Sequence, residues 1–195
     1  MDHLNFSSFL NANIEKTDLY LKPLLEHCKE QSFSKGEFLL QPGEYCKHSF
    51  YVEKGLLRQY SLDANGKEHI IQFAPENWFV SERDSVFFDN PASYYIQAIE
   101  VSRVLLFEEK FIIELSQKNE AFNEQNNRML HKHIKSLQKR INMLLGATAE
   151  ERYLDFIKTY PDVLLRVPQT MVAAYLGITP ESLSRVRKSL AKKNT

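Results

Sequence analysis

The chain has few cysteines, no long apolar run and no excess of charge of either sign. Its two cysteines, Cys28 and Cys46, lack the number and spacing of a disulfide framework, a zinc site or an iron–sulfur cluster. No apolar stretch approaches the roughly 20 residues of a membrane-spanning helix. The first residues mix acids and amides where a secretory signal has a basic start and an apolar core. We therefore expect a cytoplasmic protein with no metal, no cofactor and no membrane partner.

The 195 residues allow one large domain or two small ones, and their formal net charge is zero. The charges are nevertheless unevenly distributed. Residues 176–195 carry five basic side chains against Glu181 alone, a local charge of +4. A basic surface at one end of a neutral protein favours a sensor joined to a part that contacts DNA.

The periodicity of apolar residues changes twice along the chain. Residues 1–30 have the spacing of amphipathic helices, whereas residues 31–107 consist of short apolar stretches separated by turn signals such as Pro-Gly and Asn-Gly. Alternation in Phe50-x-Val52 and Ile96-x-Ala98 indicates half-buried strands. The middle of the chain is therefore predicted to form an antiparallel sandwich or roll. Four of the six glycines fall between these strands and the other two at predicted helix ends.

From residue 108 onward the pattern is helical, and it includes an apolar seam of heptad type. Leucines recur every seven residues and isoleucines interleave between them. The seam residues are Leu130, Ile134, Leu137, Ile141 and Leu144. A helix packed on its own domain would show the same stripe. We favour a dimer interface because the helix is long and polar on its other faces, where His131 and His133 are interpreted as solvated residues.

A second, smaller domain is predicted to begin after Gly146, where the long helix ends. Thr148 and Glu151 have the spacing of a capping box at the start of the next helix. We therefore expect a roll with N-terminal helices over 1–110, a dimerisation helix over 111–146 and a DNA-binding domain over 147–195.

The most specific motif is QTMVAAYLGITPESLSRVRK, residues 169–188. Counting from Gln169, the small Ala173 stands at position 5 and Gly177 at position 9, where a tight turn favours a residue that accepts positive φ. Thr179 is a good N-cap, and Pro180 suits the first helical turn. Apolar residues fill the packing positions 4, 8, 10, 15 and 18. This is the pattern of a helix-turn-helix.

The second helix of this motif would expose polar side chains suited to reading DNA. Arg185 could bind guanine with both arms of its guanidinium group, and Glu181 could accept from the cytosine amino group. Ser182 and Lys188 could contact phosphates. The alternative is an ordinary amphipathic helix with solvated charges. The predicted DNA-binding residues are Thr179, Glu181, Ser182, Ser184, Arg185 and Lys188.

Residues 33–192 resemble the Crp/Fnr family of bacterial transcription regulators. The resemblance includes the segments FSKGEFLLQPGE, FYVEKGLLRQY, DANGKEHIIQF and NWFVSE, the long helix and the helix-turn-helix. It implies an α+β protein with an antiparallel, jelly-roll-like β-roll (a double-stranded β-helix) as sensor, a dimerisation helix and a small winged helix-turn-helix domain. It further implies a homodimer on an inverted repeat of double-stranded DNA, a small-molecule effector and a contact with RNA polymerase. Glu181 and Arg185 match base-reading positions of the family, whose leading arginine is replaced by Pro180.

The effector site departs from the family pattern, in which a Gly-Glu pair is followed by an Arg-Ser pair that holds a cyclic phosphate. The matching pairs here are Ser81-Glu82 and Ala92-Ser93. A buried phosphate without the arginine loses a charge-assisted hydrogen bond. We therefore expect that the effector is not cyclic AMP. The pocket candidates are Ser81, Glu82, Arg83 and Ser93.

Two other functional classes remain open from the sequence. A cupin-type enzyme needs a closely spaced His-x-His, whereas His48 and His69 lie 21 residues apart, so we do not expect an enzyme. A ligand-sensing or interaction module of the same fold, without DNA binding, would fit Pro180 and a wing that we expect to be short or absent, since the sequence stops at Thr195.

Overall fold

The computed structural model describes residues 28–193, which form two compact units. Of the described residues, 28–61 and Phe73–Leu130 belong to unit 1, and Leu62–Gln72 and 131–193 belong to unit 2. The helices predicted in residues 1–30 lie almost wholly outside the described residues, as does the end of the chain after Lys193.

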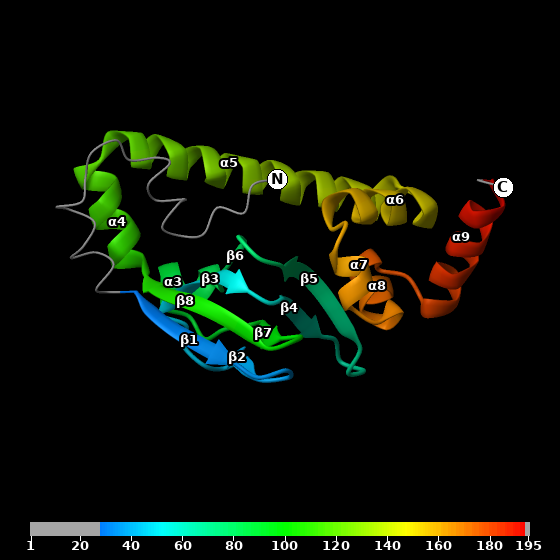
Figure 1. Ribbon diagram of the computed structural model, residues 1–195, viewed down its shortest axis with the longest axis horizontal. Helices are drawn as coiled ribbons and strands as arrows, with labels where there is room; N and C mark the ends of the chain where they lie inside the picture. Colours follow the sequence, from blue (N-terminus) through cyan, green and yellow to red (C-terminus); the bar gives the residue numbers. More distant parts are fainter. Residues whose placement is uncertain (1–27, 194–195) are drawn as a thin grey trace. The chain divides into compact units, whose positions relative to one another are not determined.

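The strands form two four-stranded sheets (Figure 1), with the orders β1-β8-β3-β6 and β2-β7-β4-β5. The pairings of β8 with β1 and β3, of β3 with β6, and of β7 with β2 and β4 are antiparallel. This arrangement confirms the predicted antiparallel roll. The strands are β1 (Lys29–Phe33), β2 (Phe38–Leu40), β3 (His48–Lys54), β4 (Leu57–Leu62), β5 (Glu68–Ala74), β6 (Phe79–Val80), β7 (Tyr95–Ala98) and β8 (Ser102–Glu108).

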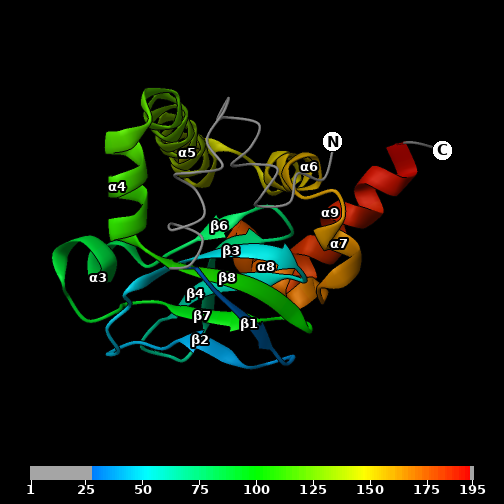
Figure 2. The same ribbon diagram turned by 60° about the vertical axis from the view of Figure 1, so that its left-hand side comes forward.

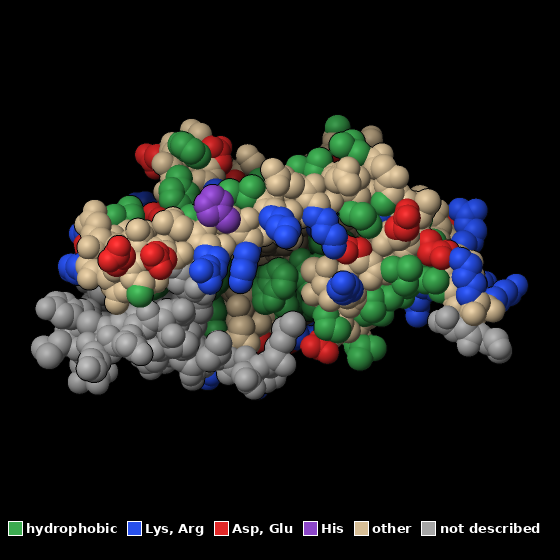
Figure 3. Space-filling view, turned by 90° about the horizontal axis from the view of Figure 1, so that it is seen from above, with side chains coloured by type: hydrophobic (Ala, Val, Ile, Leu, Met, Phe, Trp, Pro, Cys, Tyr) green, Lys and Arg blue, Asp and Glu red, His purple; other side chains and the backbone are tan. Residues whose placement is uncertain are grey.

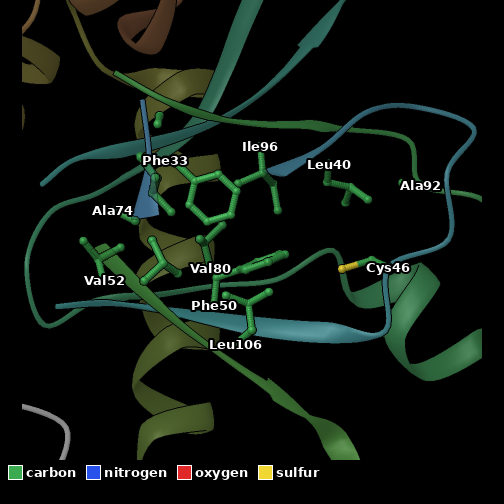
Figure 4. Close-up of a cluster of buried hydrophobic side chains, with 13 residues drawn as sticks. Phe33, Leu40, Cys46, Phe50, Val52, Ala74, Val80, Ala92, Ile96 and Leu106 are labelled. Atoms are coloured by element: carbon green, nitrogen blue, oxygen red, sulfur yellow. The ribbon is translucent and has the colours of Figure 1, made fainter. Parts of the chain in front are cut away.

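Apolar side chains from both sheets meet between them (Figure 4). Phe50 and Val52 of β3 point into this core, and Ile96 and Ala98 of β7 face them from the other sheet. The alternation read from the sequence is therefore the inside face of each strand. The short helix α3 (Arg83–Phe88) is attached at one end of the core by a hydrogen bond of 2.7 Å from the Cys46 amide to the Ser85 hydroxyl.

A second apolar cluster covers the outer face of the sheet that contains β3 and β8. Helix α4 (Glu109–Lys118) contributes Phe111 and Leu115, and helix α5 (Glu120–Gly146) contributes Phe122. Where the sequence predicts one helix over 111–146, the chain forms two. Asn119 is extended (φ −140°, ψ 106°), and its side-chain oxygen accepts from the Phe122 amide at 2.9 Å. The break allows both helices to bury aromatic residues in the same cluster.

Unit 2 contains the rest of α5 and four further helices (Figure 2). The predicted capping box is present, since Thr148 and Glu151 exchange side-chain and backbone hydrogen bonds at the start of α6. Buried aromatic residues of α6 and apolar residues of α8 and α9 form the core of this unit. The helices are α6 (Ala149–Thr159), α7 (Val163–Arg166), α8 (Gln169–Leu176) and α9 (Pro180–Lys193).

Gly55 offers a test of the close packing of the roll. It has φ +101°, and a Cβ atom there would lie 2.3 Å from the Ser102 hydroxyl oxygen. Gly36 has φ +85° and open space around the same position. We expect Gly36→Ala to cost about 1–3 kcal/mol of unfolding free energy through backbone strain alone. Gly55→Ala should cost about 1–3 kcal/mol more through overpacking. Urea unfolding of both variants measures the difference, and equal losses would contradict the packing described here.

Candidate nucleic-acid interface

The turn between α8 and α9 has the geometry that the sequence predicts. Gly177 ends α8 in the left-handed conformation (φ 67°, ψ 32°), and its N–H donates to the Ala173 carbonyl. The Ile178 N–H donates to the same carbonyl at 3.1 Å. Ala173 is 1% exposed, so a small residue is needed where the helices approach. Positions 5 and 9 of the motif are thereby confirmed.

Helix α9 begins with the predicted cap. The Thr179 hydroxyl accepts from the Ser182 N–H at 3.2 Å, and the Thr179 carbonyl accepts from the Leu183 N–H at 3.0 Å. Leu183 is buried and anchors α9 to unit 2. This packing determines which face of α9 stays in solvent.

The exposed face of α9 brings together the residues predicted to read DNA. Glu181, Arg185 and Lys188 are exposed and spaced four and three residues apart, so they lie along one side of the helix. Ser184 is half-buried. Lys and Arg side chains gather over α9 in the space-filling view (Figure 3). The local positive charge inferred from the sequence is therefore displayed on the recognition helix.

The first turn of α9 also holds a network that the sequence did not reveal. One terminal nitrogen of Arg185 donates to the Ser182 hydroxyl at 3.1 Å. The pKa of Glu181 is lowered by its own backbone N–H, by a hydrogen bond with the Thr179 side chain and by the charge of Arg185. Ser182 therefore orients Arg185 in the free protein, in addition to its predicted role at a phosphate.

The last carbonyls of α8 are satisfied by arginines from neighbouring helices. Arg152 of α6 donates to the Leu176 carbonyl at 3.1 Å and, through its other nitrogens, to Ala147 at 3.1 Å and Leu144 at 3.0 Å. A positive charge at a helix C-terminus is favourable for both hydrogen bonding and the helix dipole. Sequence reasoning missed this junction, because no local pattern distinguishes Arg152 from a solvated arginine.

The predicted seam on α5 consists of large apolar side chains that contact solvent in the single chain. Ile134, Leu137, Ile141 and Leu144 are 40% to 57% exposed, and Leu130 is half-buried. The spacing of four and three residues places these side chains on one stripe of the helix. This stripe belongs with α8 and α9 to unit 2, apart from Leu130.

The four effector-pocket candidates lie in different surroundings. Glu82 is 1% exposed and caps α3, where its carboxylate accepts from the Ser85 N–H at 2.6 Å. Arg83 and Ser93 are exposed, and Ser81 is half-buried. The guanidinium of Arg83 lies over the Phe87 ring at 5.4 Å.

Ala92, at the position where the family has its phosphate-binding arginine, is part of the apolar core. It is 4% exposed and lies in the cluster that contains Leu40 and Cys46 (Figure 4). An anion placed there would lose its hydration without gaining a charged donor, which is unfavourable.

Among residues 28–193, no group of three His, Cys, Asp or Glu side chains is placed to hold a metal ion. Within the same residues, no helix combines the length and apolar character that crossing a bilayer demands.

Comparison with known proteins agrees with this architecture. Residues 30–119 match the family model of the cyclic nucleotide-binding domain. The fumarate and nitrate reduction regulatory protein of Vibrio cholerae is 25% identical over 169 residues, which cover 81% of this chain and 67% of the relative. The anaerobic regulatory protein of Pasteurella multocida is 25% identical over 84% of this chain and 63% of its own length. The chain thus spans about two thirds of these relatives.

Solved structures show the same fold. FixK2 from Bradyrhizobium japonicum superposes with a TM-score of 0.71 at 20% identity, covering 86% of each chain. A CooA mutant from Carboxydothermus hydrogenoformans gives a TM-score of 0.75 at 22% identity, covering 97% of this chain and 85% of that protein. The chain therefore has the fold of these solved structures, with a cyclic-nucleotide-binding-type roll followed by a long helix and C-terminal helices. The resemblance to the Crp/Fnr family found in the sequence agrees with these similarities.

The position of Ala92 in the apolar core leads to a prediction about ligands. Isothermal titration with cyclic AMP and with cyclic GMP at millimolar concentration should show no heat above dilution. The physical reason is that a neutral hydrogen bond contributes only about 1 kcal/mol net, against about 1.5–3 kcal/mol for one to a charged group. Saturable binding in the micromolar range would contradict this prediction and would show that another cation has replaced the missing arginine.

Proposed function

We propose that this chain is a sequence-specific DNA-binding transcription regulator that acts as a homodimer on an inverted repeat. The observation that carries the proposal is the helix-turn-helix of α8 and α9. Its turn is closed by Gly177, its second helix is capped by Thr179, and its exposed face displays Glu181, Arg185 and Lys188. The relatives are named as regulators, which argues against an enzyme.

In the proposed complex, α9 enters the major groove and α8 crosses the backbone above it. The fork of Arg185 binds the O6 and N7 atoms of one guanine, and Glu181 accepts from the amino group of a cytosine. Lys188, one helical turn further on, contacts a phosphate. Thr179, Ser182 and Ser184 flank this face and supply hydroxyl groups to the backbone or to base edges.

The proposed dimer uses the seam on α5. Four large aliphatic side chains at heptad spacing, each at least 40% exposed, would be buried against a second copy. Because the seam and α9 belong to the same compact unit, a two-fold axis through the seam relates two recognition helices. Such pairs reach successive major grooves at a spacing of about 34 Å.

The roll is proposed to receive an effector other than cyclic AMP, and the family resemblance further suggests a contact with RNA polymerase. A module without DNA binding is the second candidate, favoured only by Pro180 at the first position of α9. The two candidates differ in one measurable property, which is selective binding to duplex DNA.

Substitutions on α9 test the proposed roles separately. Arg185→Ala should cost about 1–3 kcal/mol of binding free energy on a matched site and remove the preference at one symmetric base pair. Lys188→Ala should weaken binding to matched and mismatched sites alike. It should also reduce the slope of the logarithm of affinity against the logarithm of salt concentration by about 0.9, the value for one phosphate contact. Fluorescence anisotropy on both kinds of site, over a range of salt, measures the two effects. Indistinguishable behaviour of the two variants would show that the roles are wrongly assigned.

The seam on α5 leads to a prediction about assembly. Leu137→Glu with Ile141→Glu would bury two carboxylates between the helices and should give monomers in light scattering. Ser136→Glu with Asn142→Glu introduces the same charge at exposed positions of the same helix and should leave the dimer intact. A monomeric wild-type protein, or dissociation by both pairs, would contradict the interface.

A further inference from the structure

Arg140 joins three segments of unit 2 that are distant in the sequence. Its guanidinium is carried by α5, the helix of the proposed dimer seam. One terminal nitrogen, Nη2, donates to the Ile70 carbonyl at 2.7 Å and to the Tyr175 carbonyl at 3.0 Å. The guanidinium carbon also lies 3.7 Å from the centre of the Tyr175 ring. Two hydrogen bonds and a cation–π contact thus converge on one side chain.

Each acceptor is a backbone group that needs a donor from outside its own element. Ile70 belongs to β5, which is the edge strand of its sheet, and the outer groups of an edge strand have no neighbouring strand. Tyr175 lies in the last turn of α8, whose carbonyls have no intrahelical donors. Arg140 supplies both donors from a single nitrogen. The Tyr175 carbonyl is therefore held at a fixed distance from α5 and from β5.

The ring of Tyr175 extends this attachment into the core of the unit. Its centre lies 5.3 Å from that of Phe156 and 5.5 Å from that of Tyr160, both on α6. Arg140 covers the ring from the side of α5. Only arginine combines a planar, permanently charged group that stacks on an aromatic ring with several donors in fixed directions. Lysine or glutamine at this position would lose part of the arrangement.

The seam helix carries Arg140 between Leu137 and Ile141, on the half-buried side of α5 rather than on the exposed stripe. The contact therefore does not compete with dimerisation. Instead it ties the first helix of the helix-turn-helix directly to α5, the helix that would pack across the two-fold axis of the proposed dimer. The direction of α8 relative to that axis determines where each α9 meets DNA.

We infer that Arg140 is a positioning residue for DNA recognition: it sets the separation and phase of the two recognition helices without touching DNA. The inference rests on the proposed dimeric DNA-binding function and adds a determinant of half-site spacing. Neighbouring base pairs are rotated by about 35° about the helix axis, so a change of one base pair between half-sites demands a different relation of the two α9 helices. A rigid attachment of α8 should therefore give a sharp preference for one spacing.

The experiment compares duplexes that carry the same two half-sites and differ only in the number of base pairs between them. Wild-type protein should bind one spacing best. Arg140→Gln should lose about tenfold or more in affinity at that spacing, because charge-assisted bonds and the stacked cation are removed. It should lose less at spacings one base pair longer or shorter, so that the preference becomes flatter. Base preference within each half-site should stay unchanged.

The matched control is Lys135→Gln, which removes the same charge from an exposed position of α5. It should shift all affinities together and leave the spacing preference intact. Arg140→Lys keeps the charge but not the planar fork, and it should give an intermediate profile. Urea unfolding of each variant identifies any loss of folding. If Arg140→Gln fails to fold, the DNA affinity of Arg140→Lys at each half-site spacing tests the inference in its place.

The inference would be overturned if a folded Arg140 variant lost DNA affinity by the same factor at every half-site spacing, however large that factor is. A residue that only stabilises the fold would produce that result. Failure of the wild-type protein to bind any duplex is a different outcome, which would contradict the proposed function itself.

Discussion

The structure of the proposed DNA-binding part of unit 2 depends on how α8 ends. The chain must pass from α8 to α9 through three residues, Gly177 to Thr179, and this turn leaves the last carbonyls of α8 without donors from their own helix. The Gly177 and Ile178 amides donate to the Ala173 carbonyl. Arg152 donates to the Leu176 carbonyl, and Arg140 donates to the Tyr175 carbonyl. The guanidinium groups come from α5 and α6. The requirement for donors therefore fixes α8, and with it α9, against α5, the helix that carries the proposed dimer seam.

The roll matches the cyclic nucleotide-binding domain, but the residues that the family resemblance assigns to a phosphate site have other surroundings here. Ala92 contributes to the apolar core, and the carboxylate of Glu82 is used to cap α3. The Glu82 carboxylate keeps lone pairs beyond the one that accepts from the Ser85 amide, so its capping role alone does not exclude a ligand hydroxyl. The difference from a phosphate site lies at Ala92, which supplies no charged donor and packs in the apolar core instead.

The sequence was most informative where function depends on local geometry. The turn at Gly177, the caps at Thr148 and Thr179 and the alternation of the strands follow from residue type and spacing over a few positions, and the structure contains each of them. The break at Asn119 was missed, because the helical periodicity continues across it and only the burial of Phe122 against the roll reveals it. Arg140 and Arg152 were missed for a related reason, since their acceptors are backbone carbonyls of other elements and a sequence pattern does not register such partners.

In the proposed complex, two copies of α9 that are related by the seam on α5 read DNA together. This arrangement is tested by selection of binding sites from a pool of random duplexes with the purified wild-type protein. We expect enrichment of an inverted repeat whose half-site centres lie about 10 base pairs apart, one turn of the double helix. Enrichment of an isolated half-site or a direct repeat would contradict the proposed dimer, and the absence of any enriched sequence would contradict DNA recognition by α9.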